Sequence, residues 1–102
     1  MIKANLNRAH MKYAVLSGCD LSEAHLNYAD LSYAFLHNAD LSYADLSYAD
    51  LMRADLRHTY IGYTNLNGAV IDIVNKDIID PSTEGYSSIR WVSEDESYPP
   101  FY

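Results

Sequence analysis

A five-residue pattern repeats without interruption through most of this chain, and its clearest run spans residues 24–56. Each unit has a small residue, a polar residue, a large aliphatic residue and two variable positions. The large position is occupied by Leu6, Met11, Leu16, Leu21, Leu26, Leu31, Leu36, Leu41, Leu46, Leu51, Leu56, Ile61, Leu66 and Ile71. The small position, two residues earlier, is occupied by Ala4, Ala9, Ala14, Cys19, Ala24, Ala29, Ala34, Ala39, Ala44, Ala49, Ala54, Thr59, Thr64 and Ala69. A fixed period of this kind constrains the fold more strongly than local propensities do.

A period of five fits neither an amphipathic helix nor a long strand. Five residues advance about 140° around a helix, so the leucines would spread around the whole cylinder. Within a unit, however, the small and the large residue are two positions apart, as they would be on one face of a strand. We therefore expect a short extended side that carries both residues inward, then a corner, then the next side.

The units Ala29–Tyr33 and Ala44–Tyr48, both ADLSY, resemble the A(D/N)LXX units of the pentapeptide-repeat family. The resemblance covers Ala4 to Ile73, which is fourteen units. It implies an all-β solenoid: a right-handed, four-sided parallel β-helix with one unit per side and about three and a half coils. It implies little about function, because one fold serves many functions.

The repeat also suggests how the chain is divided. Residues 1–73 are expected to form the β-helix, residues 74–92 a non-repeat C-terminal cap, and residues 93–102 an acidic, flexible tail. The residues expected to cover the last open coil are Ile78, Ile79, Ile89 and Trp91. The first coil, around residues 4–11, leaves an edge of unpaired backbone. Either Met1 and Ile2 fold over that edge or a partner covers it, and a homodimer is the partner we favour.

The composition excludes several classes of function. The net charge of −7 argues against direct binding to nucleic acid, which needs a basic surface. The N-terminal region lacks the apolar core of a signal peptide, and no segment is long and apolar enough to span a membrane. The single cysteine, Cys19, takes a small inward position, where we expect a buried thiol that behaves like alanine. A reducing cytoplasmic location follows as the default.

No catalytic constellation can be named. The sequence contains no GxSxG, HExxH, phosphate-binding glycine loop or CxxC motif. We therefore expect a non-enzymatic protein with no catalytic, cofactor-binding or metal-binding residues.

Two kinds of exposed side chain are candidates for an interaction surface. With four units per coil, residues twenty apart lie over one another, which pairs Val15 with Phe35. These two apolar residues replace the usual polar residue, so either a partner or the tail covers them. The tyrosines stack in the same way and either stiffen the corners or form a recognition surface. The register stacks Tyr13 on Tyr33, Tyr28 on Tyr48 and Tyr43 on Tyr63, and the last two pairs are the candidates for an interaction surface.

The same register produces two acidic columns, Asp20 over Asp40 and Asp30 over Asp50. As a structural feature, each aspartate would accept local backbone amides at a turn. As a functional feature, the columns would form an acidic face.

These observations favour a non-enzymatic protein-interaction module or scaffold whose partner the sequence does not identify. The family resemblance implies an alternative: some pentapeptide-repeat proteins mimic duplex DNA and bind a type II topoisomerase, DNA gyrase, which they modulate or protect. The net charge of the chain is negative, as that of DNA is, which agrees with this alternative.

Overall fold

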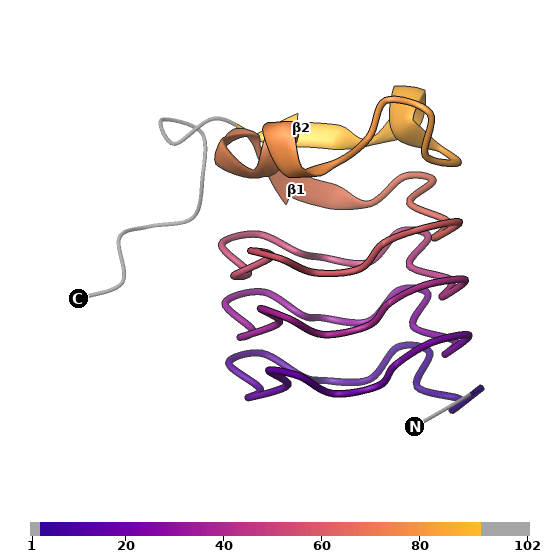
Figure 1. Ribbon diagram of the computed structural model, residues 1–102, viewed down its shortest axis with the longest axis vertical. Coiled ribbons are helices and arrows are strands. Elements are labelled where there is room, and N and C mark those ends of the chain that lie inside the picture. Colours follow the sequence, from indigo (N-terminus) through magenta and orange to yellow (C-terminus); the bar gives the residue numbers. More distant parts are fainter. Residues whose placement is uncertain (1–2, 93–102) are drawn as a thin grey trace.

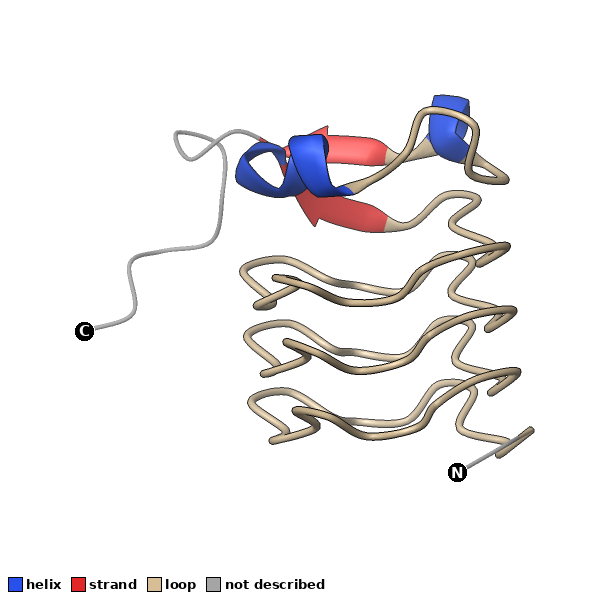
Figure 2. Cartoon of the chain, viewed as in Figure 1, coloured by secondary structure: helices blue, strands red, loops and turns tan. Residues whose placement is uncertain are grey.

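The computed structural model describes residues 3–92, and these residues form a stack of coils (Figure 1). The regular elements all lie near the C-terminal end of the described chain: β1 (Val70–Asp72), η1 (Ile73–Ile78), η2 (Tyr86–Ser88) and β2 (Arg90–Val92). The coils before β1 are drawn as loop in Figure 2, although they follow one another with a constant spacing. No helix in the described part of the chain is long and apolar enough to cross a bilayer.

A ladder of parallel bridges joins residues twenty apart, for example Val15 with Phe35 and Asp20 with Asp40. Within a coil, a turn closes every five residues: the Ala9 amide donates to the Leu6 carbonyl at 3.0 Å, and the Ala14 amide donates to the Met11 carbonyl at 3.0 Å. Four turns therefore fit between one residue and the residue that lies over it. The coil is four-sided, with one unit on each side.

Each turn places its third residue in the left-handed region. Tyr28 and Tyr33 have φ values of 63° and 62°, and Arg8 and Glu23 behave in the same way. A positive φ at the third residue only is the signature of a type II turn, which normally favours glycine. Non-glycine residues accept this conformation here because it directs their amides to the next coil: the Tyr28 amide donates to the Ser47 carbonyl at 3.0 Å. The hydrogen bonds between coils thus offset the local strain.

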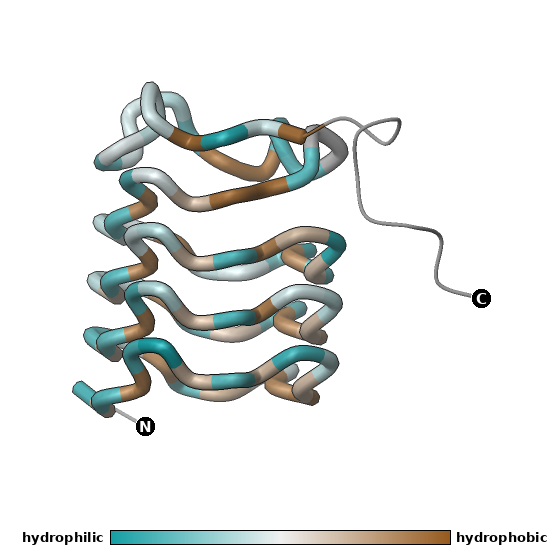
Figure 3. The backbone as a smooth tube through the Cα atoms, turned by 180° about the vertical axis from the view of Figure 1, so that it is seen from behind, coloured by the Kyte–Doolittle hydropathy of each residue, from teal (hydrophilic) through white to brown (hydrophobic). Residues whose placement is uncertain are grey.

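The core is a column of leucines beside a column of alanines. From Leu21 to Leu56 the large residues are almost completely buried, and Figure 3 shows the apolar segments in register from coil to coil. Burying one leucine side chain contributes roughly 1.5–3 kcal/mol. Thr59 and Thr64 replace alanine without leaving an unpaired hydroxyl, because their Oγ1 atoms donate to the carbonyls of Leu36 and Leu41 at 2.9 and 2.6 Å.

The segment after the repeats continues the stack. β2 pairs with β1 in parallel, Val70 opposite Arg90, which is again an offset of twenty residues. Ile79 and Ile89 belong to the buried core, and Ile78 and Trp91 pack against it. Just before β1, the register between the coils differs by one residue. There the Leu66 amide donates to the Glu84 carbonyl, whereas the equivalent amide one coil earlier, that of Leu46, donates to the Asn65 carbonyl. The tail assigned to residues 93–102, and Met1 and Ile2 at the first coil, lie outside the described residues.

The solenoid contains less regular sheet than the term β-helix suggests. Among the described residues only β1 and β2 are strands, each three residues long, and the other contacts between coils are isolated bridges. The physical reason is the short period, since a turn begins almost as soon as each side has made its ladder bonds.

Glycine substitutions test how the turns are built. Gly62 has an ordinary φ, and a Cβ there would meet no atom within 4 Å. We expect Gly62→Ala to stabilise the fold by about 0.4–1 kcal/mol, because it restricts the unfolded chain. Gly85 has φ +80°, and a Cβ there would overlap the backbone of Asn67. We expect Gly85→Ala to destabilise. Urea unfolding of both variants measures the two effects, and a loss of stability in Gly62→Ala would contradict this description of the turn.

Candidate interaction surfaces

Three pairs of tyrosines stack across neighbouring coils. The ring centroids of Tyr28 and Tyr48 lie 5.1 Å apart and those of Tyr43 and Tyr63 lie 5.0 Å apart, with interplanar angles of 11° and 15°. Tyr13 and Tyr33 stack at 5.0 Å and 29°. Offset stacking at such distances contributes roughly 0.5–1.5 kcal/mol per pair. The stacked tyrosines therefore stabilise the corners.

The six residues of the expected interaction surface lie on two opposite faces. Tyr43 and Tyr48 flank the side that carries Asp45, so the Tyr43–Tyr63 and Tyr28–Tyr48 stacks border one face of the prism. Val15 and Phe35 lie ten residues away from members of the Asp45 column. Ten residues are two sides of the coil, so the two residues occupy the opposite face. The chain thus presents two separate surfaces rather than one.

Val15 and Phe35 form an apolar patch, a term used below for these two residues only. They are bridged to one another across neighbouring coils, and they are 77% and 46% exposed. Next along the same column is Asp55. Two adjacent apolar side chains at positions that are mostly polar elsewhere are typical of a contact surface.

Each aspartate of the two acidic columns has a structural role. Asp20 Oδ1 accepts the Ser22 amide at 3.0 Å and the Ser22 hydroxyl at 2.5 Å, and these bonds lower the pKa of Asp20. The same contact to the amide two residues later occurs in other units: Asp30 to Ser32, Asp40 to Ser42, Asp45 to Ser47 and Asp50 to Met52. Asn65 makes it too, through its Oδ1 and the Asn67 amide at 2.9 Å. The contact therefore needs an acceptor oxygen, not a charge.

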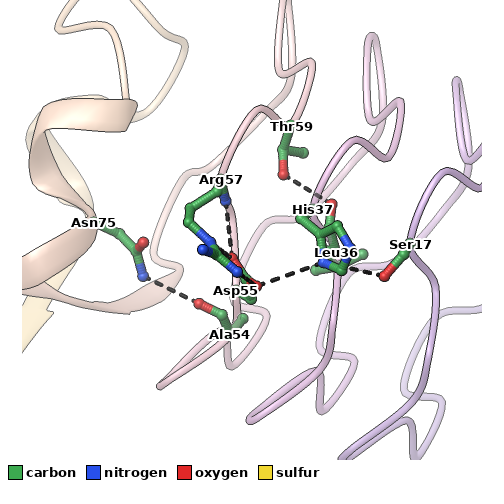
Figure 4. A network of polar contacts seen from close by, with 8 residues as sticks. All are labelled: Ser17, Leu36, His37, Ala54, Asp55, Arg57, Thr59 and Asn75. Carbon is green, nitrogen blue, oxygen red and sulfur yellow. Dashed lines mark hydrogen bonds and ion pairs between the residues drawn. The ribbon is translucent and has the colours of Figure 1, made fainter.

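A polar network that we did not anticipate runs along one corner (Figure 4). The Ser17 hydroxyl lies 3.1 Å from His37 Nδ1, and the same nitrogen lies 3.5 Å from Asp55 Oδ2. Arg57 holds Asp55 with two bonds, Nε to Oδ1 at 2.8 Å and Nη2 to Oδ2 at 2.7 Å. The twenty-residue register from Ser17 to His37 to Arg57 is the sequence signal that would have indicated this network.

The network combines serine, histidine and aspartate but does not form a catalytic triad. In a triad the serine contacts one ring nitrogen, which takes its proton, and the carboxylate contacts the other nitrogen, where it fixes the tautomer and stabilises the imidazolium. Here both partners face Nδ1 of His37. Asp55 is also committed to Arg57, whose guanidinium lowers the pKa of Asp55 to about 2. The arrangement therefore stabilises the corner and does not activate Ser17.

Cys19 is partly buried and packs against the leucine core, as a small apolar residue would. In the part of the chain that the structure describes, no three metal-ligating side chains come together as a cation site.

An open pocket of about 420 Å³ lies where the last tyrosine stack meets the segment that follows η1. Its lining residues are Tyr63, Asp80, Ser82, Thr83 and Glu84. The sequence did not indicate this pocket, because it depends on where a non-repeating segment comes to lie.

The architecture agrees with comparisons against known proteins. The pentapeptide repeats match this chain in eight copies, over residues 4–42, 19–57 and 36–72. The chain therefore belongs to the pentapeptide-repeat family, whose members fold as right-handed β-helices. The resemblance inferred from the ADLSY units is confirmed. No curated protein matches.

The solved structures that resemble this chain include two pentapeptide repeat proteins. A pentapeptide repeat protein from the thylakoid lumen of Arabidopsis thaliana is 30% identical, with a TM-score of 0.65, over 79% of this chain and 52% of its own. This chain thus spans about half the length of that relative. A pentapeptide repeat protein from Nostoc Pcc 7120 is 28% identical over 88% of this chain and 86% of its own, with a TM-score of 0.30.

The Asp55–Arg57 pair makes stability depend on pH. The pKa of Asp55 falls from an ordinary value of 3.8 to about 2 in the folded chain, so its contribution is present above 3.8 and is lost as the pH falls toward 2. We expect Asp55→Asn to lower Tm at neutral pH, and we expect its difference from the wild type to shrink as the pH falls through that window. Circular dichroism melts at several pH values measure this. Arg57→Gln should show the same loss, and a difference that stays constant down to pH 2 would contradict the assignment.

Proposed function

We propose that this protein is a non-enzymatic protein-interaction module, and that the apolar patch of Val15 and Phe35 is its principal contact. The observation that carries the proposal is the exposure of both side chains side by side on one face. The ladder between coils holds this face in place on both sides of Val15: the Phe35 amide donates to the Ala14 carbonyl at 2.9 Å, and the Phe35 carbonyl accepts the Leu16 amide at 2.8 Å. A partner that binds there orders few further groups, which lowers the entropic cost of association.

The borders of the patch suggest how such a partner is oriented. On one side the Lys12 ammonium lies 5.4 Å from the ring centroid of Tyr13, at the preceding corner. Asp55 continues the column beyond Phe35, and its partner Arg57 lies at the following corner. An apolar centre with charged groups at its rim is the ordinary arrangement of a protein interface.

Phe35→Asp tests the patch with little risk to the fold. Aspartate takes the equivalent position on neighbouring sides, at Asp30 and Asp40, where it accepts the amide two residues later. We expect the variant to melt like the wild type and to bind the partner at least tenfold more weakly, because it places a charge in an apolar contact.

The partner would be identified by cross-linking from a photoreactive residue at Val15, and its affinity would then be measured with purified proteins. His25→Asp is the matched control, since His25 is exposed at the same position on the opposite face. Equal affinity of the Phe35→Asp variant and the wild type for the cross-linked protein would rule out the patch.

The alternative function, mimicry of DNA toward a type II topoisomerase, is favoured by one observation. Asp20 lies against Asp40, and Asp30 lies against Asp50, on opposite faces of the prism. Carboxylates would then follow one another at about the 4.8 Å spacing of paired strands. Two points weigh against it: the carboxylates already serve the turns, and the repeats predict only about three and a half coils.

Asparagine substitutions separate charge from structure in this alternative. Asn5 and Asn65 show that an amide oxygen serves the turn as well as a carboxylate does. A variant with Asp20, Asp30, Asp40 and Asp50 all changed to Asn should therefore keep its fold. If the columns mimic DNA, the wild type alters supercoiling by DNA gyrase in proportion to its concentration and the variant does not. The absence of any effect of the wild type would reject mimicry.

A cytoplasmic location is part of the same proposal. It is supported by Cys19, whose thiol packs against the core without a second cysteine in the chain to pair with.

A further inference from the structure

The tyrosine stacks of this chain differ in whether a cationic side chain lies over one of their rings. The Arg8 guanidinium carbon lies 4.5 Å from the ring centroid of Tyr28, at one end of the Tyr28–Tyr48 stack. The Lys12 ammonium lies 5.4 Å from the centroids of both Tyr13 and Tyr33. Cations at these distances are attracted by the negative face of the ring.

The Tyr43–Tyr63 stack has no such cation among the residues that the structure describes. Glu23 precedes Tyr43 in the same column, and Lys3 pairs with Glu23 at 4.0 Å rather than with a ring. At the other end, one face of the Tyr63 ring is against Tyr43 while the side chain as a whole remains 78% exposed. The open face of Tyr63 is therefore available to a ligand.

The pocket described above lies at this open end. The segment beyond Tyr63 carries the small residues Ser82 and Thr83 instead of another aromatic ring, and the space they leave is the pocket of about 420 Å³. Its size is within the range of pockets that bind small ligands and side chains.

The charge of the pocket is negative. Two of its lining residues, Asp80 and Glu84, are acidic, and none is basic. Asp80 Oδ1 accepts the amide and the hydroxyl of Ser82, both at 2.9 Å, and these bonds lower the pKa of Asp80. The carboxylate is thus ionised at neutral pH. The cavity combines a free aromatic face with two carboxylates.

We propose that this pocket binds the guanidinium group of an arginine side chain from a partner protein, which takes the place over Tyr63 that Arg8 takes over Tyr28. The proposal rests on the proposed function, since it specifies a second contact of the same interaction module.

Arginine fits this pocket better than lysine does. A guanidinium is planar, so it can lie flat on the Tyr63 ring while its edge donates to a carboxylate. Its bonds to carboxylates are charge-assisted and can be bidentate, as the Asp55–Arg57 pair of this chain shows. An ammonium group is more strongly hydrated and lacks the flat face.

The test is an NMR titration of the isotope-labelled full chain with the probe peptide acetyl-Gly-Arg-Gly-amide at physiological salt. We expect saturable shifts confined to the Tyr63 ring and the backbone amides of Asp80 and residues 82–85. The same peptide with citrulline, which is neutral and nearly isosteric, should cause none. A lysine peptide should bind more weakly.

Variants assign the effect to the pocket. Tyr63→Ala and Glu84→Gln should each weaken binding by about fivefold or more. Tyr28→Ala is the matched control, because it removes a ring at the same turn position from the stack that Arg8 already serves. Glu84 is exposed, so Glu84→Gln keeps the test valid if Tyr63→Ala fails to fold.

Three results would overturn the proposal: equal shifts with arginine and citrulline, shifts spread over all the acidic faces, or tighter binding of free spermidine than of the peptide. The titration does not involve the apolar patch. A negative titration combined with a partner that depends on Phe35 would therefore remove only this pocket, whereas arginine binding without such a partner would remove only the patch.

Discussion

The hydrogen bonds between successive coils are the interaction on which the rest of this structure depends. They fix the twenty-residue register, and they hold corner residues such as Tyr28 in a conformation that most side chains avoid. Because the backbone provides these bonds, the side chain at the corner does not have to. Tyrosine, arginine, histidine, asparagine and glutamate all occupy the same turn position without changing its geometry.

Because the backbone holds the turns, the residues that stabilise the fold differ from those available for recognition. Inward-facing leucine and alanine, together with the backbone ladder, form the core, and the outward positions are left to vary from unit to unit. Where a unit carries aspartate or asparagine at the outward position, that residue still contributes through its acceptor oxygen, which explains why either of the two can stand there. Where an outward residue gives up that role, as at Val15 and Phe35, the turn forms without it: the Cys19 amide still donates to the Leu16 carbonyl at 3.0 Å. Such positions are the natural places to look for function.

Much of the fold could be predicted from the sequence because the period is exact. Once the register of twenty was assumed, the pairing of Tyr28 with Tyr48 and of Val15 with Phe35 followed by arithmetic. Two features could not be predicted from the sequence, for physical reasons. The contact of His37 with Ser17 and Asp55 depends on side-chain rotamers, which the period does not specify. The pocket beside Tyr63 depends on residues 80–84, where the register shifts by one and the repeat no longer determines which groups meet.

The four-sided register has a consequence for how such a chain can change in length. Loss of a single unit between Phe35 and Asp55 would leave the core pattern intact, because alanine and leucine would still alternate correctly. It would, however, rotate everything downstream by one side, and Tyr60 rather than Asp55 would then follow Phe35 in its column. Every face beyond that point would be composed of different residues. Only additions or losses of whole coils preserve the surfaces, so a lineage of such proteins can lengthen without losing a binding face only in steps of twenty residues.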